Sequence, residues 1–236
     1  MSSSGLKTTN FKIMTEYNKQ QKLSDGTDTA IAYSTCCAQF LVYQDEFVEL
    51  YNCDSRLFEN DNRTVDLVFA DPPFGMNLDE FENILMKKCS GHTFLMTNER
   101  VLIPFSNKYL DYFVRMYAIN TVIPNLISNK APMQLADFVS EFRFGKTRFE
   151  NNNECFSNLI EAKKIRMIKQ YSQNFDKQKS LFAFFFNHFT KEGDLILDPF
   201  CGSGSSLLAA RQLKRKIIGF EIDSKSCQYA KNKLLQ

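Results

Sequence analysis

Apolar runs of strand length alternate with stretches of helical spacing along most of this chain. The runs with the composition of buried strands are residues 47–52, 65–70, 92–97, 119–127, 193–197 (after a turn) and 216–220. The stretches with helical spacing are residues 79–88, 108–116 and 205–215. Because strands that alternate with helices pack as parallel sheets, the pattern predicts an α/β fold with a mostly parallel sheet. Residues 181–189 are apolar all round, which predicts a helix buried against that sheet.

The apolar run at 65–70 is followed by the tetrapeptide Asp71-Pro72-Pro73-Phe74. Proline cannot donate to a strand ladder, so the strand ends here, and the carboxyl end of a strand is where open α/β sheets bind ligands. The Asp71 carboxylate and nearby carbonyl oxygens are then suited to accept hydrogen bonds from an exocyclic base amine. Phe74 is suited to stack on the base, an interaction of roughly 1–3 kcal/mol. Taken alone, the tetrapeptide is explained equally well by a tight turn with Phe74 in the core.

A glycine-rich turn joins a later strand to a helix. The sequence DPFCGSG at 198–204 lies between the strand at 193–197 and the helix that begins at residue 205. Gly202 and Gly204 lack a Cβ and let a ligand approach the backbone. Glu221 follows the next strand about 20 residues beyond the glycines, where an acid in such folds binds a ribose. These features favour a nucleoside cofactor over an ordinary turn, and the absence of a Lys-Ser or Lys-Thr pair after the last glycine argues against ATP or GTP.

Together the two motifs resemble the catalytic and cofactor motifs of S-adenosylmethionine-dependent DNA amino-methyltransferases, in the permuted order of the β class. In that family the tetrapeptide with Asp first marks mostly adenine-N6 enzymes, whereas cytosine-N4 enzymes usually carry Ser there. The resemblance implies a doubly wound, Rossmann-like methyltransferase fold in circularly permuted order. It also implies S-adenosylmethionine as the cofactor and adenine as the favoured base.

The resemblance extends to three further segments and implies a set of site residues. Asp54, in Tyr51–Ser55, resembles the acid that lies near the cofactor's adenine, although Cys53 replaces the usual glycine. Lys179 and Ser180 resemble the motif that lines the methionine end of the cofactor, without the usual His-Pro lead-in. The implied catalytic residues are Asp71, Pro72, Pro73 and Phe74. The implied cofactor-binding residues are Asp54, Lys179, Ser180, Asp198, Pro199, Phe200, Gly202, Gly204 and Glu221, the last on the ribose hydroxyls.

The chain divides into four expected segments. Residues 1–45 form a polar N-terminal arm, 46–127 the catalytic half, 128–172 a small target-recognition insertion, and 173–236 the S-adenosylmethionine-binding half. The insertion mixes basic side chains with phenylalanines, which suits contacts with phosphates and base edges. Acidic residues in the same segment balance much of that charge, so no single residue there is assigned to DNA.

Composition agrees with one globular domain. A chain of 236 residues with 44% hydrophobic content leaves no room for a second full domain, and a net charge of +2 neither requires nor excludes nucleic acid. Seven cysteines without a CxxC pair favour a reducing, cytoplasmic setting. His92 and His188 are the only histidines, so we expect no metal site. The longest apolar run is too short to span a bilayer, so we expect no membrane association.

The predicted function is site-specific methylation of duplex DNA at the N6 amine of a flipped adenine. Cytosine-N4 methylation and RNA or protein amino-methylation are the alternatives, and an inactive cofactor-binding subunit is a third. A cytosine-C5 mechanism needs a nucleophilic cysteine, typically after a proline, and no Pro-Cys pair occurs. A homodimer and a cognate restriction endonuclease are possible partners that the family resemblance suggests.

Overall fold

The computed structural model describes residues 37–73, 76–125, 134–144, 159–161 and 177–236. Within these residues nine strands form one sheet in the order β1-β2-β9-β8-β3-β4-β6-β5-β7. The strands are β1 (Leu41–Gln44), β2 (Val48–Tyr51), β3 (Val65–Ala70), β4 (Cys89–Met96), β5 (Phe113–Asn125), β6 (Gln134–Arg143), β7 (Leu159–Glu161), β8 (Leu195–Asp198) and β9 (Lys216–Phe220). Strands β2, β9, β8, β3 and β4 are parallel neighbours, which confirms the mostly parallel α/β sheet.

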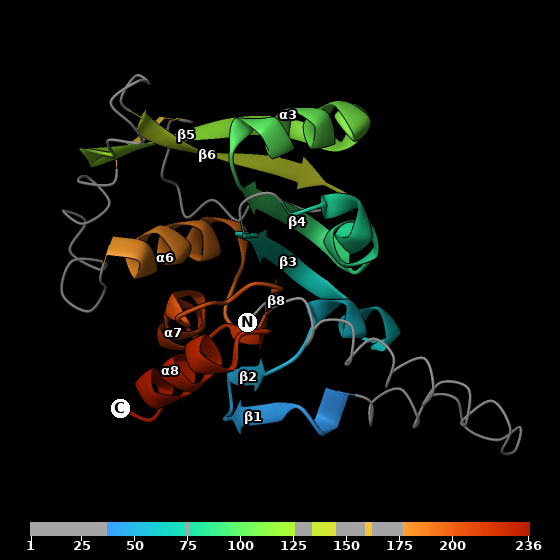
Figure 1. Cartoon of the computed structure of the whole chain (residues 1–236), viewed down its shortest axis with the longest axis vertical. Helices are drawn as coiled ribbons and strands as arrows, with labels where there is room; N and C mark the ends of the chain where they lie inside the picture. Colours follow the sequence, from blue (N-terminus) through green and yellow to red (C-terminus); the bar gives the residue numbers. More distant parts are fainter. Residues whose placement is uncertain (1–36, 74–75, 126–133, 145–158, 162–176) are drawn as a thin grey trace, which may run out of the picture.

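The last two strands of the chain lie in the middle of the sheet. Strands β8 and β9 are inserted between β2 and β3, with Leu197 opposite Val68 and Asp198 opposite Gly219. The cofactor motif therefore follows a strand that is the direct neighbour of the strand before Asp71, although the two motifs are far apart in sequence. Figure 1 shows this arrangement, with the C-terminal elements beside β3 and β2.

Helices cover both faces of the sheet (Figure 1). One face carries α6 (Lys177–Phe189), α7 (Ser205–Gln212) and α8 (Ser224–Leu234); the other carries η1 (Ser55–Asn60), η2 (Leu78–Phe81), η3 (Asn83–Lys87) and α3 (Glu99–Lys108), which η4 (Leu110–Tyr112) follows. Along β3, Leu67 and Phe69 pack into the first layer and Val68 and Ala70 into the second. No helix within the described ranges combines the length and the apolar character that a membrane span requires.

The phenylalanine-rich helix α6 packs on the central strands, as its composition predicts. Phe182 lies edge-on to Phe69 of β3 with ring centroids 4.9 Å apart, and Phe189 lies 4.7 Å from Phe94 of β4. Phe189 also lies 5.0 Å from His92, which precedes Phe94 in β4, so the last turn of α6 lies nearer the amino ends of the strands and its first turn nearer the carboxyl edge. The helix therefore runs antiparallel to the strands that it covers.

One helix prediction is wrong, and another is modified. Residues 108–116 were expected to be helical, yet α3 ends at Lys108 and Phe113 begins the long strand β5. The helix begins earlier because the Asn98 side chain accepts a hydrogen bond from the Val101 backbone and caps it. Pairing with β6 on one side and β7 on the other holds β5 extended, which overrides local helical spacing. The expected helix at 79–88 consists of the short turns η2 and η3.

Two segments that were expected outside the sheet contribute strands to it. Strand β1, from the expected N-terminal arm, pairs antiparallel with β2, and strands β6 and β7 lie within the expected insertion at 128–172. A buried carboxylate joins β6 to its two neighbours in the sheet: Glu141 of β6 accepts from His92 Nδ1 of β4 at 2.9 Å and from the Tyr117 hydroxyl of β5 at 2.7 Å. The recognition role of this segment stays a prediction.

Candidate active site

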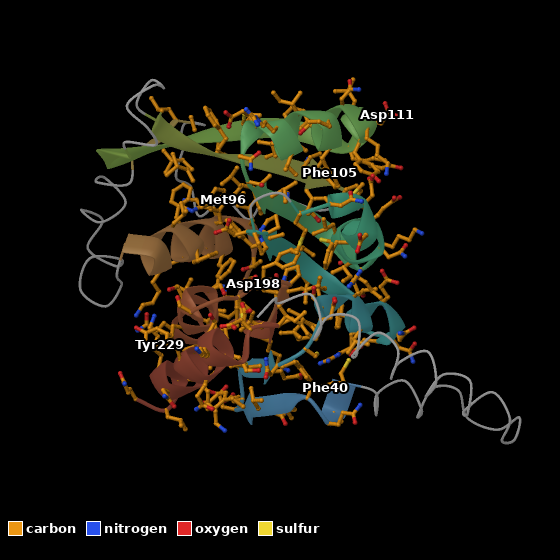
Figure 2. All side chains as sticks on the ribbon, viewed as in Figure 1. Phe40, Met96, Phe105, Asp111, Asp198 and Tyr229 are labelled. Atoms are coloured by element: carbon orange, nitrogen blue, oxygen red, sulfur yellow. The ribbon has the colours of Figure 1, made fainter. Side chains whose placement is uncertain are left out.

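Three acidic side chains lie at the carboxyl ends of adjacent strands. Asp71 follows β3, Asp198 ends β8, and Glu221 follows β9, and these strands are neighbours. Neighbouring strands are about 4.8 Å apart, so the backbones that carry Asp71 and Glu221, two strands apart, are about 10 Å from each other. Figure 2 shows Asp198 near the middle of the molecule. This edge brings the two sequence motifs together at one site.

The catalytic tetrapeptide starts where its prolines end the strand. Asp71 is exposed at the sheet edge, Pro72 is buried and Pro73 is exposed. The backbone amide of Met76 donates to the Pro73 carbonyl at 3.2 Å, which turns the chain toward η2. Phe74 lies outside the described residues, so its stacking role stays a prediction. The Asp71 carboxylate is accessible from solvent, as a group that must reach a substrate has to be.

Asp198 is the buried acid of the site. Only 2% of its surface is exposed; its Oδ1 accepts from the Phe200 amide at 3.0 Å, and its Oδ2 accepts from the Ser206 hydroxyl. Burial raises the pKa of Asp198 to about 7, and the charges of Asp71 and Glu221 add to that rise, while the two hydrogen bonds oppose it. The effect of Asp71 on this pKa ties the tetrapeptide electrostatically to the cofactor loop.

The glycine loop needs its glycines for two different reasons. Gly202 has a φ of +50°, and its amide donates to Glu221 Oε2 at 2.9 Å, so its backbone conformation aims this donor at the acid. Gly204 has a φ of +77°, and a Cβ there would lie 2.8 Å from the Ala230 Cβ of α8. Gly204 therefore permits the close packing of α7 on α8, and its part in ligand approach stays a prediction. Pro199 is buried in the same loop.

Glu221 is held in a fixed orientation. Its two carboxylate oxygens accept from the backbone amides of Gly202 and Asp223, at 2.9 and 2.7 Å. Its own amide donates to the Tyr51 carbonyl at 3.0 Å, which continues the pairing of β9 with β2. A carboxylate has about four acceptor positions, so each oxygen keeps a lone pair for a ligand hydroxyl. This geometry suits the ribose contact that the sequence predicts.

Asp54 has a protein partner that the sequence did not reveal. Its carboxylate caps η1 through the Arg56 amide at 2.9 Å and pairs with the Arg56 guanidinium at 2.6 Å. Arg56 also pairs with Glu80 of η2 and lies over the Phe81 ring, 5.5 Å from its centroid. Phe81 in turn packs 5.1 Å from Phe200 of the cofactor loop. Arg56 thus links the end of β2 to the segment that follows the Asp71 loop.

Lys179 and Ser180 lie in the first turn of α6. Ser180 is 2% exposed, and Lys179 is partly buried. Phe182, one half-turn later, contacts Phe69 just before the end of β3. These two residues therefore lie toward the carboxyl side of the sheet, and their role in binding the cofactor stays a prediction.

Both histidines have partners within the protein. His92 donates to Glu141, and His188 Nδ1 donates to the Phe184 carbonyl at 2.7 Å inside α6. Within the described ranges, no three His, Cys, Asp or Glu side chains are grouped as metal ligands. A hollow of about 320 Å³ lies at the opposite edge of the sheet, beside the amino ends of β2, β8 and β9, and is separate from the three acids.

The proteins to which this chain is similar are described as DNA methyltransferases. Residues 148–232 match the family model described as DNA methylase. The type II methyltransferase M.HindIII of Haemophilus influenzae is 49% identical over 45 residues, which are 19% of this chain and 15% of that protein. The orphan methyltransferase M.BamHII of Bacillus amyloliquefaciens is 23% identical over 166 residues, covering 60% of this chain and 61% of that protein. The chain thus spans less than two thirds of these relatives.

Solved structures share the fold. The crystal structure of M1.HpyAVI superposes with a TM-score of 0.65 at 20% identity, covering 80% of this chain and 99% of that chain. The PvuII cytosine-N4-specific DNA methyltransferase also gives 0.65, at 18% identity, covering 83% and 89%. The predicted Rossmann-like methyltransferase fold is therefore confirmed. One of these neighbours is described as cytosine-N4-specific, so the shared fold does not select a base.

Proposed function

We propose that this protein transfers a methyl group from S-adenosylmethionine to the N6 amine of an adenine that is flipped out of duplex DNA. The observation that carries the proposal is the meeting of Asp71, Asp198 and Glu221 at the carboxyl ends of adjacent strands. The DNA methylase match over residues 148–232 supports the same activity. Asp at the first position of the tetrapeptide favours adenine over cytosine.

The residues at this edge fit the proposed cofactor. Glu221 keeps acceptor positions for the ribose hydroxyls, beside a glycine loop that lets a ligand approach. Asp54 would lie near the adenine of the cofactor, and Lys179 and Ser180 near its methionine end. S-adenosylmethionine supplies an electrophilic methyl group on a positively charged sulfur. A cation suits this edge, because the neighbouring charges that raise the pKa of Asp198 are all negative.

Asp71 would orient the base amine. The target base must leave the duplex, because its amine is otherwise engaged in pairing and out of reach. The exposed Asp71 carboxylate would then accept from the amine, assisted by the Pro72 carbonyl, while Phe74 stacks on the ring. The same carboxylate would stabilise the positive charge that develops on the nitrogen, so catalysis rests on positioning and electrostatics.

Cytosine N4 is the second candidate acceptor. The PvuII cytosine-N4 enzyme shares the fold at a TM-score of 0.65, and an amine clamp treats both exocyclic amines alike. RNA or protein amino-methylation and an inactive cofactor-binding subunit are the alternatives that remain if no methylated nucleoside forms from duplex DNA. Duplex DNA is the proposed partner, while a homodimer, a cognate restriction endonuclease and a cytoplasmic location stay predictions.

The hairpin of β5 and β6 supports a role for the middle of the chain in binding the target. Strand β4 ends at Met96, opposite Val139, whereas β6 begins at Gln134 and β5 runs on to Asn125. Both strands therefore continue past the carboxyl edge where Asp71 lies. At about 3.4 Å per residue, five further residues of β6 correspond to about 17 Å. We propose that this extension and the rest of 128–172 contact the duplex.

The proposal is tested by supplying S-adenosylmethionine and mixed-sequence duplex DNA, digesting to nucleosides and identifying methylated species by mass spectrometry. We expect N6-methyladenine in the wild type and loss of at least about 1,000-fold in rate for Asp71→Ala, because the amine clamp is removed. Asp111→Ala is the matched control: Asp111 is exposed and lies far from Asp198 in Figure 2. Full activity in Asp71→Ala would refute the proposed role, and N4-methylcytosine would move the assignment to the second candidate.

A further inference from the structure

Asn52 makes a hydrogen-bond bridge beside the proposed cofactor acid. Its side-chain Nδ2 donates to the backbone carbonyl of Glu221 at 2.8 Å, and its Oδ1 accepts from the Ser224 hydroxyl at 2.9 Å. Its own backbone amide donates to the Phe40 carbonyl at 2.9 Å. One side chain at the end of β2 thus holds both ends of the turn from Glu221 to Ser224.

The bridge replaces a bond that the sheet can no longer supply. The Glu221 amide pairs with the Tyr51 carbonyl, so a continuing parallel ladder would offer the Glu221 carbonyl a backbone donor from the next part of β2. The chain turns away at Asn52, and the side-chain amide provides that donor instead. The Glu221 carbonyl fixes which way the amide faces, because a carbonyl oxygen can only accept, and the Ser224 hydroxyl then donates to the amide oxygen.

The Glu221 turn therefore has four anchors. Gly202 holds the carboxylate to the cofactor loop, the Asp223 amide holds it to the start of α8, and the Tyr51 carbonyl and the Asn52 side chain hold the Glu221 backbone to β2. Of the four, only the Asn52 anchor is made by a side chain. Removing it leaves a partly buried carbonyl without that partner and leaves the bond to Tyr51 as the remaining one of the two backbone anchors.

We propose that Asn52 is a positioning residue that sets the orientation of Glu221 toward the ribose of the cofactor. The inference rests on the proposed function, since Glu221 is assigned to the ribose there. Asn52 does not itself contact the ligand in this proposal. It acts through Glu221, so its loss should weaken the recognition of ribose hydroxyls in particular, and the rest of the ligand should be affected little.

The test measures binding by calorimetry with two probes, S-adenosylhomocysteine and its 2′-deoxyribose analogue, neither of which can donate a methyl group. Asn52→Ala should raise the dissociation constant of S-adenosylhomocysteine about tenfold, the effect of one well-placed hydrogen bond. The wild type should bind the deoxy analogue more weakly than S-adenosylhomocysteine. Asn52→Ala should raise the dissociation constant of the deoxy analogue by less than about threefold. Asn52→Asp keeps the size and the acceptor for Ser224 but loses the donor, so it should behave like Asn52→Ala.

Gln228→Ala is the matched control, because this exposed amide donates to Asn232 at 3.0 Å on the outside of α8 and should leave both affinities unchanged. An equal loss for both probes in Asn52→Ala, or no loss for either, would overturn the positioning role. Thermal unfolding of each variant separates general destabilisation from a local effect. If wild type binds neither probe, the proposed cofactor itself is wrong and the inference fails with it.

Discussion

Replacing Asp198 by Asn should change how the stability of the protein depends on pH. The pKa of this carboxyl rises from 3.8 to about 7 on folding, mainly because it is buried. Below pH 3.8 the group is neutral in both states and has no effect. As pH rises from 3.8 to about 7 the unfolded chain loses the proton while the folded protein keeps it, so the folded state loses relative stability, and the loss is complete above pH 7. The difference corresponds to about 4 kcal/mol as an upper bound.

Asparagine keeps the shape and the oxygen that accepts from the Phe200 amide, and its amide can donate to the Ser206 hydroxyl. In urea unfolding without cofactor from pH 4.5 to 8.5, the free energy of unfolding should therefore decline less steeply with pH for Asp198→Asn than for the wild type. At pH 8 the variant should be more stable than the wild type by up to about 4 kcal/mol. Asp111→Asn, at an exposed position, should follow the wild type. Identical pH profiles for Asp198→Asn and wild type would refute the argument that a neutral, buried acid lies in the cofactor loop.

Two further substitutions test the packing and the link around the site. Gly204→Ala should destabilise the protein by about 2–4 kcal/mol in thermal or urea unfolding, because it combines a positive φ with a contact of 2.8 Å to Ala230. Gly193→Ala is its control, with a φ of +88° and open space, and should cost only about 1 kcal/mol; equal losses would contradict the packing argument. Arg56→Ala should lower kcat/KM for methylation about fivefold, because it frees the segment after Asp71. Arg63→Ala is the control, since it breaks similar ion pairs with Asp61 and Glu49 and should leave kcat/KM unchanged. Equal effects of the two substitutions would argue against the link through Arg56.

Local chemistry made the strand ends and the cofactor loop predictable. Pro72 cannot continue a ladder, so the end of β3 at Ala70 follows from sequence alone. The glycines of the cofactor loop and the strand that precedes Glu221 are also recognisable from the local sequence. The apolar composition of α6 predicted that this helix is buried. The helix expected at 108–116 was wrong because the choice between helix and strand there depends on β6 and β7, which pair with β5 from elsewhere in the chain.

The supporting residues of the site were not predictable in the same way. Asn52, Arg56 and Ser206 are ordinary polar residues in the sequence, and their partners are Glu221, Glu80 and Asp198. Asn52 and Glu221 are 169 residues apart in the sequence, so no local spacing of residues predicts the hydrogen bond between them. A polar residue directly after a predicted strand is the one available signal, since such residues lie at the sheet edge.

The sequence by itself determined where the strands before the two motifs end and which residues are candidates for the chemistry, because prolines, glycines and acids at strand ends act through their own backbone and side-chain properties. Only the tertiary structure decided that these residues meet. The insertion of β8 and β9 between β2 and β3 sets Asp71 and Glu221 on either side of Asp198, and the burial of Asp198 together with the charges of these two neighbours raises its pKa. Strand order and electrostatic coupling are properties of the packed sheet, since they depend on which distant segments become neighbours.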